Sequence, residues 1–234
     1  MINRHPLLIV GMHRSGTSCL AGCLESGGLT LGDVNEYANF NKRGTREHEA
    51  IRDIHDSLFE SAGASWDHPP ISQISWTMDH VDQLKDQTKA FDNVAHWGLK
   101  DPRSIFCLNG WKALFEPRYV VTYRHPLAVR DSLVTRAEVW KQPMSSDHAL
   151  EIWVAYNKEV LRQTEGTPTP YIRYDVAPDA YKNRLAKICR LFGLDIEKAC
   201  EFYSTSLTNF TANDEDIPEH CRPVWDELEA RFVS

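Results

Sequence analysis

The stretch Leu7–Ser18, with the sequence LLIVGMHRSGTS, decides the fold class of this chain. Its first four residues form a continuous apolar run, which is typical of a fully buried strand of a parallel sheet. A polar turn from Gly11 to Ser18 follows. We expect a helix from about Gly16 to Ser26, ended by Gly27-Gly28. A strand, a glycine-bearing turn and a helix in this order predict the first unit of an α/β fold.

The rest of the chain repeats this alternation. Further strands are expected at 94–99, 118–123 and 170–174, and helices at 45–62, 79–92, 104–115, 126–138, 147–164 and 178–192. Strands that alternate with helices imply a parallel sheet covered on both faces. The predicted fold class is therefore α/β, with three layers and a central parallel sheet flanked by helices. The acidic segment from residue 211 onward is expected to be solvated or to lie over the surface.

Length and charge exclude several classes of protein. The 234 residues fit one large domain, so 1–234 is expected to form a single unit. The formal net charge of −7 argues against a general nucleic-acid-coating function, although a local anion site is compatible with it. No apolar run approaches the roughly 20 residues that a membrane helix needs. Without a signal-peptide pattern, the default localisation is cytoplasmic. The cysteines lack CxxC or zinc-finger spacing and are expected to be reduced.

The turn from Gly11 to Ser18 has the chemistry of a phosphate-binding loop. Its glycines let an anion approach the backbone, and successive N–H groups at the helix N-terminus would cradle it. The spacing matches G-x-x-x-x-G, but Thr17 stands where ATPases and GTPases carry Lys. A P-loop kinase or NTPase is therefore the weaker alternative. A second alternative is a strand, turn and helix whose glycines serve packing alone. It is weak, because Arg14, Ser15 and Ser18 are more polar than packing requires.

A second anion site is predicted after the strand at 118–123. Arg124 ends this strand, and Ser132 should lie two turns into the following helix. An Arg fork with a hydroxyl suits a dianionic monophosphate. Basic residues outnumber acidic ones between Lys100 and Arg136, although the chain is acidic overall. The alternative is a basic helix face that makes only surface salt bridges.

These segments carry a family resemblance. His13-Arg14-Ser15-Gly16-Thr17-Ser18 resembles the 5′-phosphosulfate loop of sulfotransferases that use 3′-phosphoadenosine 5′-phosphosulfate (PAPS). Asn41-Lys42-Arg43-Gly44-Thr45-Arg46-Glu47 resembles the N-x-x-G-x-x-E segment of bacterial members, although Thr45-Arg46 replaces their aromatic pair. Lys100-Asp101-Pro102-Arg103 matches the K-D-P-R motif of these members and resembles the K-D-P of tyrosylprotein sulfotransferases. Arg124 through Ser132 resembles the 3′-phosphate motif, and Arg173-Tyr174-Asp175 a late R-Y-E segment. The resemblance implies a P-loop NTPase-like sulfotransferase fold.

The resemblance also implies a reaction. A sulfuryl group would pass from PAPS to a hydroxyl or amine acceptor by in-line displacement, leaving 3′,5′-adenosine bisphosphate. Lys100 and Arg14 would stabilise charge on the sulfuryl group and bridging oxygen, and Glu47 would take the acceptor proton. His48, Glu49 and His13 are alternative bases. The residues implied in nucleotide binding are His13, Arg14, Ser15, Gly16, Thr17, Ser18, Arg124, Ser132 and Tyr174.

Structural roles remain open for some of these residues. The helix dipole alone would favour an acid near Glu47. Lys100 with Asp101 could form an ion pair at a strand end, Arg103 could orient the loop, and Tyr174 could be core. The family needs no metal, and the sequence shows no cluster of metal ligands, so none is expected. A sulfotransferase-like nucleotide-binding protein without catalysis is a further alternative.

Two loop-like segments, 63–80 and 138–150, are candidates for an acceptor site. They contain Trp66, His68, Trp76, Trp140 and Met144. Aromatic loop residues often line substrate pockets, although these could equally form the core of a lid. A glycan, a lipid, a small molecule and a peptide remain open as acceptors, and the oligomeric state is not indicated.

Overall fold

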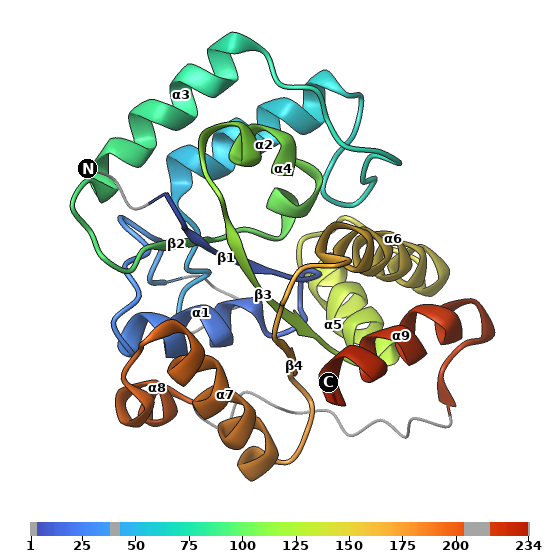
Figure 1. Ribbon diagram of the computed structural model, residues 1–234. Helices are drawn as coiled ribbons and strands as arrows, with labels where there is room; N and C mark the ends of the chain where they lie inside the picture. Colours follow the sequence, from blue (N-terminus) through green and yellow to red (C-terminus); the bar gives the residue numbers. More distant parts are fainter. Residues whose placement is uncertain (1–3, 38–42, 204–215, 234) are drawn as a thin grey trace.

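A parallel four-stranded sheet forms the centre of the computed structural model, which describes residues 4–37, 43–203 and 216–233. The strand order is β2-β1-β3-β4. The strands are β1 (Leu7–Val10), β2 (Gly98–Lys100), β3 (Arg118–Tyr123) and β4 (Tyr171–Arg173) (Figure 1). The register places Leu8 beside Leu99 on one side and beside Tyr119 on the other. The buried run at Leu7–Val10 is thus a central strand, as the sequence predicts.

Helices cover both faces of this sheet (Figure 1). One face carries α1 (Thr17–Ser26), α7 (Pro178–Phe192) and α8 (Ile196–Phe202). The other carries α2 (Glu49–Ser61), α3 (Met78–Thr88), α4 (Leu108–Leu114), α5 (Pro126–Val139), α6 (Ser146–Thr164) and α9 (Arg222–Val233). Short 3₁₀ turns span Lys89–Phe91, Pro102–Phe106 and Glu219–Cys221. The predicted three-layer α/β architecture is confirmed.

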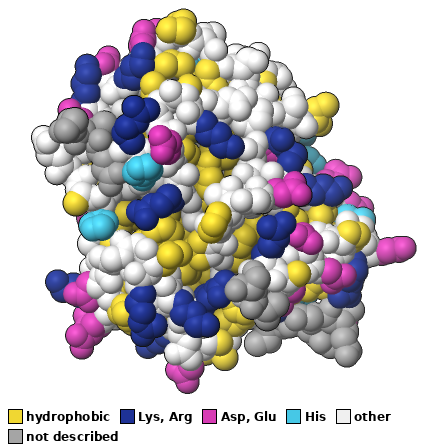
Figure 2. Space-filling view, in the orientation of Figure 1, with side chains coloured by type: hydrophobic (Ala, Val, Ile, Leu, Met, Phe, Trp, Pro, Cys, Tyr) yellow, Lys and Arg dark blue, Asp and Glu magenta, His cyan; other side chains and the backbone are white. Residues whose placement is uncertain are grey.

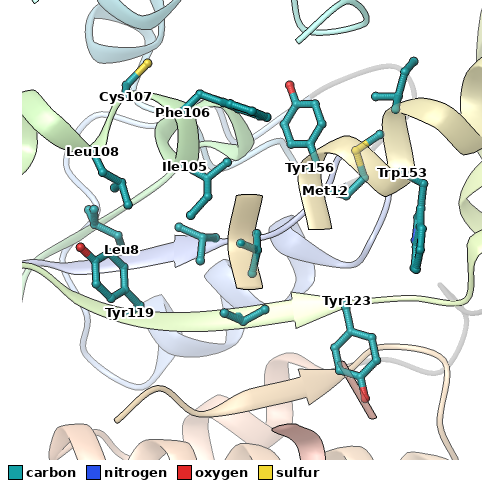
Figure 3. Close-up of a cluster of buried hydrophobic side chains, with 14 of the residues drawn as sticks. Leu8, Met12, Ile105, Phe106, Cys107, Leu108, Tyr119, Tyr123, Trp153 and Tyr156 are labelled. Atoms are coloured by element: carbon teal, nitrogen blue, oxygen red, sulfur yellow. The ribbon is translucent and has the colours of Figure 1, made fainter. Parts of the chain in front are cut away.

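Alternate side chains of β1 enter two separate apolar cores. Leu8 and Val10 point into the core beneath α2, α4 and α6, whereas Leu7 and Ile9 pack against α1 and α7. This division follows from the two-residue period of a strand. Figure 3 shows the first core, in which Tyr156 and Trp153 of α6 lie close to Met12. Because both faces are buried, the strand is apolar at every position.

Several predicted boundaries were wrong for local reasons. The helix expected from Thr45 begins only at Glu49. The backbone of this stretch pairs instead with Asn35, which donates to Glu47 O (3.2 Å) and accepts from Arg46 N (3.0 Å). The strand expected from residue 94 begins at Gly98. The helix expected at 104–115 is divided between a 3₁₀ turn and α4.

The acidic C-terminal segment differs most from expectation. Its described part forms α9, which buries Val224, Trp225 and Leu228 against the sheet, with exposed fractions of 4%, 2% and 0%. The hydroxyl of Tyr123 donates to Glu229 of this helix (2.6 Å). The segment is therefore one wall of the core rather than a solvated tail. Residues 211–215 of this segment, and Asn41 and Lys42 of the N-x-x-G-x-x-E segment, lie outside the described residues.

Among the helices that are described, none is both long and apolar enough to cross a membrane.

Candidate active site

The motif residues meet at one edge of the sheet. Gly11 follows β1, Lys100 ends β2, Arg124 follows β3 and Tyr174 follows β4. Because all four strands are parallel, their carboxyl ends lie at the same edge. This edge is where open α/β sheets bind ligands. Segments that are far apart in the sequence thus lie together at one site.

Glycines determine the shape of the β1–α1 loop. A Cβ at Gly11 would lie 2.2 Å from Thr122 O, so the loop passes too close to β3 for a side chain. Gly16 has φ 85°, and a Cβ there would lie 2.3 Å from the ring of Tyr174. Arg14 takes a left-handed conformation (φ 66°), which is costly for a residue with a side chain. Such strain is common where a loop is shaped for binding.

The loop offers hydrogen-bond donors that the described residues leave unused. Gly16 is the N-cap of α1 and supplies no side-chain cap, so the first N–H groups of the helix face the loop. The hydroxyl of Ser15 is buried and has no partner among the described residues. Thr122 fixes the loop from below by donating to Ser15 O (2.9 Å). Ser18 anchors it to the 43–48 segment by donating to Thr45 O (3.0 Å).

Two arginines join this loop to the second anion site. Arg14 Nε donates to Ser132 Oγ (2.8 Å), and Arg124 Nη1 donates to Arg14 O (3.3 Å). The guanidinium of Arg124 lies 5.5 Å from the ring centre of Tyr174. Neither arginine forms an ion pair with a described carboxylate. Burial lowers the pKa of both groups, and each lies close enough to the other for Arg124 to lower the pKa of Arg14 further.

Lys100 and Glu47 form a buried ion pair next to this site. Lys100 Nζ lies 2.5 Å from Glu47 Oε1, and the two residues are only 3% and 9% exposed. Arg103 Nη1 lies 3.9 Å from the other carboxylate oxygen of Glu47. The ion-pair partner predicted for Lys100, Asp101, bonds Arg103 instead (2.9 Å). Thus the fold brings Glu47 and Lys100 together, although they are distant in the sequence.

A buried relay of hydrogen bonds fixes Asp101 and so the K-D-P-R segment. Trp111 Nε1 donates to His55 Nε2 (3.1 Å), and His55 Nδ1 lies 2.8 Å from Asp101 Oδ2. Because an indole N–H can only donate, His55 carries its proton on Nδ1 and donates it to Asp101. Although burial opposes ionisation, Arg103 and His55 hold the pKa of Asp101 well below its usual range. No local pattern in the sequence indicates this support, because His55 is a lone histidine on a helix.

The four candidate bases occupy different surroundings. Glu49 is exposed and pairs with Arg52 (3.3 Å). His48 is buried with its ring 6.4 Å from that of Phe91. His13 is buried, and desolvation together with the nearby Arg103, Arg136 and Lys100 lowers its pKa well below the usual value. His13 is therefore neutral at pH 7, and its Nε2 has no partner among the described residues. The charges that act on His13 place it near Lys100, on the same side of the site as Glu47.

A cavity of about 700 Å³ lies beyond His13 and is lined by both predicted acceptor segments. Trp66 and His68 come from the first segment, and Trp140 and Met144 from the second. The rings of His13 and Trp66 are 5.2 Å apart, which places the phosphate loop beside the cavity wall. Trp76 is not among the lining residues; its indole donates to Cys107 O (3.1 Å) and packs over Gly110.

Arg136 is a site residue that the motifs did not reveal. Its guanidinium lies 4.6 Å from the ring centre of Trp66 and 4.7 Å from that of Trp140. Burial, together with the charges of Arg14 and Arg103, lowers its pKa to about 10, whereas Glu47 acts in the opposite direction. Arg136 thus lies between the cavity and the Lys100–Glu47 pair. Its position one helical turn after Ser132 in α5 was the signal available in the sequence.

The comparisons with known proteins bear on the fold. No protein-family model matches the chain, and no curated protein matches it. Among solved structures, it is similar to the sulfotransferase domain from the curacin biosynthetic pathway, at 14% identity and a TM-score of 0.57, covering 98% of this chain and 99% of that one. It is also similar to the sulfotransferase domain from the Synechococcus PCC 7002 olefin synthase, at 18% identity and a TM-score of 0.56, covering 99% and 96%. The chain therefore has the fold of sulfotransferase domains.

Proposed function

We propose that this protein is a sulfotransferase that transfers a sulfuryl group from PAPS to a hydroxyl or amine acceptor. The observation that carries the proposal is the convergence of three features at one sheet edge. These are a phosphate loop at a helix N-terminus without a side-chain cap, a pair of arginines without carboxylate partners among the described residues, and a buried Lys beside a buried Glu. An aromatic cavity next to them supplies room for an acceptor.

The residues present fit the nucleotide. The N–H groups at the start of α1, which lack a side-chain cap, suit the 5′-phosphate end. So does the Ser15 hydroxyl, which has no partner among the described residues. Arg124 and Ser132 suit the 3′-phosphate, because a planar guanidinium binds phosphate oxygens in pairs. Arg14, implied above to act on the sulfuryl group, bonds Ser132 and so lies within reach of this second phosphate as well. Arg124 Nε is buried without a partner among the described residues, as expected of a donor kept for a ligand. Tyr174 packs against Gly16 and Arg124 and so separates the two sites.

PAPS would supply an activated sulfuryl group attached to a phosphate leaving group. Lys100 would place a cation where negative charge builds up, in a site from which water is largely excluded. Glu47 would hold the acceptor proton, and its present bond to Lys100 implies that Lys100 must shift toward the donor to release it. Neutral His13 is the second group able to accept this proton, because its buried Nε2 is unpartnered.

A phosphate-transferring P-loop enzyme is less well supported. Thr17 is buried at the position where such enzymes carry the Lys that contacts the terminal phosphates. The described cations near the loop include Arg14, Arg124 and Lys100, which suit transfer without a metal. We therefore expect the nucleotide to bind equally well with and without Mg²⁺.

The first test is a thermal titration that does not require the acceptor. The purified protein is titrated with 3′,5′-adenosine bisphosphate, PAPS, ADP and ATP, each with and without Mg²⁺, while Tm is followed. A rise with the 3′-phosphorylated nucleotides alone, independent of Mg²⁺, is the expected result. A Mg²⁺-dependent rise with ATP or ADP would favour a kinase or NTPase and contradict the proposal.

The second test separates the two proton acceptors. Glu47→Gln and His13→Asn are compared in turnover and in affinity for the bisphosphate. If Glu47 is the base, Glu47→Gln lowers turnover by roughly 100-fold or more while nucleotide affinity stays within a few-fold. A normal rate in Glu47→Gln with a low rate in His13→Asn assigns the role to His13. Normal rates in both variants would exclude both.

A further inference from the structure

Three potential metal ligands meet at the mouth of the acceptor cavity. Asp67 and His68 lie in the first segment, and His148 lies in the first turn of α6. One ligand atom of each lies within 4.8 Å of the others. The sequence alone predicts no such cluster, because only the fold brings His148 to a pair of residues far from it in the chain. We propose that Asp67, His68 and His148 bind a divalent transition metal of the Zn²⁺ type.

Both segments hold their ligands in fixed positions. Residues 65–68 form a tight turn, in which Ser65 N donates to His68 O (3.0 Å) and His68 N donates to Ser65 O (3.1 Å). On the other segment, Ser145 caps α6 by accepting from His148 N (3.1 Å). Tyr156 joins the first segment to α6, the helix that carries His148, because its hydroxyl donates to Trp66 O (3.0 Å). The cluster is thus built on a preformed frame, which lowers the entropic cost of binding.

The donor atoms point to a ligand shared among them. His148 Nε2 is buried and has no partner among the described residues. Glu151 Oε2 lies 3.6 Å from His148 Nδ1, on the other side of the ring. A carboxylate beside one ring nitrogen commonly accompanies a histidine that binds a metal through the other. The rings of His148 and His68 are 4.7 Å apart and inclined by 37°. One ligand nitrogen of each lies within 4.8 Å of the other, which is close enough for both to bind one ion.

Asp67 completes a mixed donor set. Its Oδ1 accepts from Ser65 Oγ (2.6 Å), which leaves the second carboxylate oxygen for a ligand. Two imidazoles and one carboxylate suit Zn²⁺ and similar borderline ions, rather than Mg²⁺ or Ca²⁺, which prefer oxygen ligands. Three protein ligands leave a further coordination position for water or for a group in the cavity. His68 is 71% exposed along its side chain, so an ion can enter from solvent.

The ion would join the two segments that line the cavity. One segment lies between α2 and α3, and the other between α5 and α6, so a bound ion would cross-link loops from distant parts of the chain. We therefore expect metal binding to stiffen the cavity mouth and to raise Tm. The site uses none of the residues assigned above to nucleotide binding or sulfuryl transfer, so it does not depend on the proposed reaction.

Binding of the metal alone tests the proposal. Tag-free, chelator-treated protein is titrated with Zn²⁺ in competition with a chromophoric chelator, and with Co²⁺ while its visible d–d bands are recorded. We expect one equivalent to bind. His68→Ala and His148→Ala should each lower Zn²⁺ affinity by at least about tenfold, since loss of a ligand costs no less than loss of a supporting group. His96→Ala, at an exposed histidine away from the cluster, is the matched control and should bind as the wild type does.

Two outcomes would overturn the proposal: no stoichiometric Zn²⁺ binding by the wild-type protein, or binding that survives both substitutions. His68 is exposed, so His68→Ala tests the site without disturbing the core. Titration of the same variants with 3′,5′-adenosine bisphosphate keeps the two proposals separate, because nucleotide affinity should not change. Zn²⁺ binding without nucleotide binding would support the metal site and contradict the proposed sulfotransferase function.

Discussion

The proposed nucleotide side and the proposed acceptor side of the candidate site are built in opposite ways. The nucleotide side is made of strand ends and the loop after β1, and it is fixed by glycines that touch neighbouring backbone or rings. The acceptor cavity is made of two long connections and one face of α5, and aromatic and imidazole side chains line it. The first depends on backbone geometry that few other residues could supply. The second depends on side chains that could be exchanged without moving the sheet.

This contrast suggests a division of labour. A donor that is common to many reactions needs a site whose geometry stays the same. The acceptor, in contrast, is selected by side chains on loops, which can be exchanged without changing the fold. The cavity accordingly lies away from the central strands. On the face shown in Figure 2, basic and acidic side chains are interspersed. The Lys100–Glu47 pair, by contrast, is buried at the sheet edge. The following variants test whether the two sides are separable.

The largest effect is expected at Lys100, where the two sides meet. Lys100→Ala should lower turnover by roughly 1,000-fold and the affinity for 3′,5′-adenosine bisphosphate by less than about tenfold, because a positioned cation acts mainly on charge that develops in the transition state. Turnover is measured with any acceptor that the wild type sulfates. The control is Lys112→Ala, at an exposed lysine of α4. A loss confined to affinity would make Lys100 a nucleotide-binding residue only.

A smaller effect is expected at Arg124, on the nucleotide side. Arg124→Ala should weaken binding of the bisphosphate by roughly 100-fold, because it removes charge-assisted hydrogen bonds to a phosphate. Arg118→Ala, at the opposite end of the same strand, is the matched control, since Arg118 packs on Phe192. Isothermal titration measures both. Equal affinities for the two variants would exclude Arg124 from the 3′-phosphate site.

A pH effect is expected at His13, on the boundary with the cavity. The folded protein holds the pKa of His13 well below its ordinary value, so the unfolded chain binds more protons once the pH falls below about 6.5. The free energy of unfolding should therefore fall with decreasing pH in this range, by up to about 1.4 kcal/mol per pH unit from His13 alone. Urea unfolding between pH 7.5 and 5.5 gives the free energy of unfolding at each pH. This free energy should depend less steeply on pH in His13→Asn than in the wild type. An unchanged slope would mean that His13 is protonated in the folded protein.

The smallest effect on fold and nucleotide is expected at Trp140, on the acceptor side. Its side chain is 47% exposed and packs on Arg136, so Trp140→Ala should cost less than about 0.5 kcal/mol of stability. Affinity for the bisphosphate should stay within about twofold, while the KM for an acceptor rises. A large loss of nucleotide affinity would show that the two sides are not separable.

The same contrast explains what the sequence could predict. Gly11, Arg14 and Gly16 lie in one short stretch, so the loop and its strand-to-helix setting were visible as a local pattern. The grouping of His148 with Asp67 was not, because only tertiary packing brings them together. The single-domain organisation and the roles of the site residues stay predictions.

Helix α9 was missed for a different reason. Its acidic residues suggested a solvated segment, and the apolar positions Val224, Trp225 and Leu228 are too few to stand out among them. Their burial depends on the sheet face that β4 and α6 offer. Local propensity could not supply this information, since most helical stability in proteins comes from tertiary packing.

The central position of β1 also has a kinetic consequence. This strand is formed by residues near the start of the sequence, yet both of its neighbours, β2 and β3, come from much later in the chain. Such non-local pairing loses loop-closure entropy before the contacts between the strands form and stabilise the chain, so it slows folding. The β1–α1 loop cannot take its shape until β3 supplies the carbonyl of Thr122 against which Gly11 packs. During refolding, helical signal should therefore recover early, and the capacity to bind an anion should return only with the slow phase that completes the sheet.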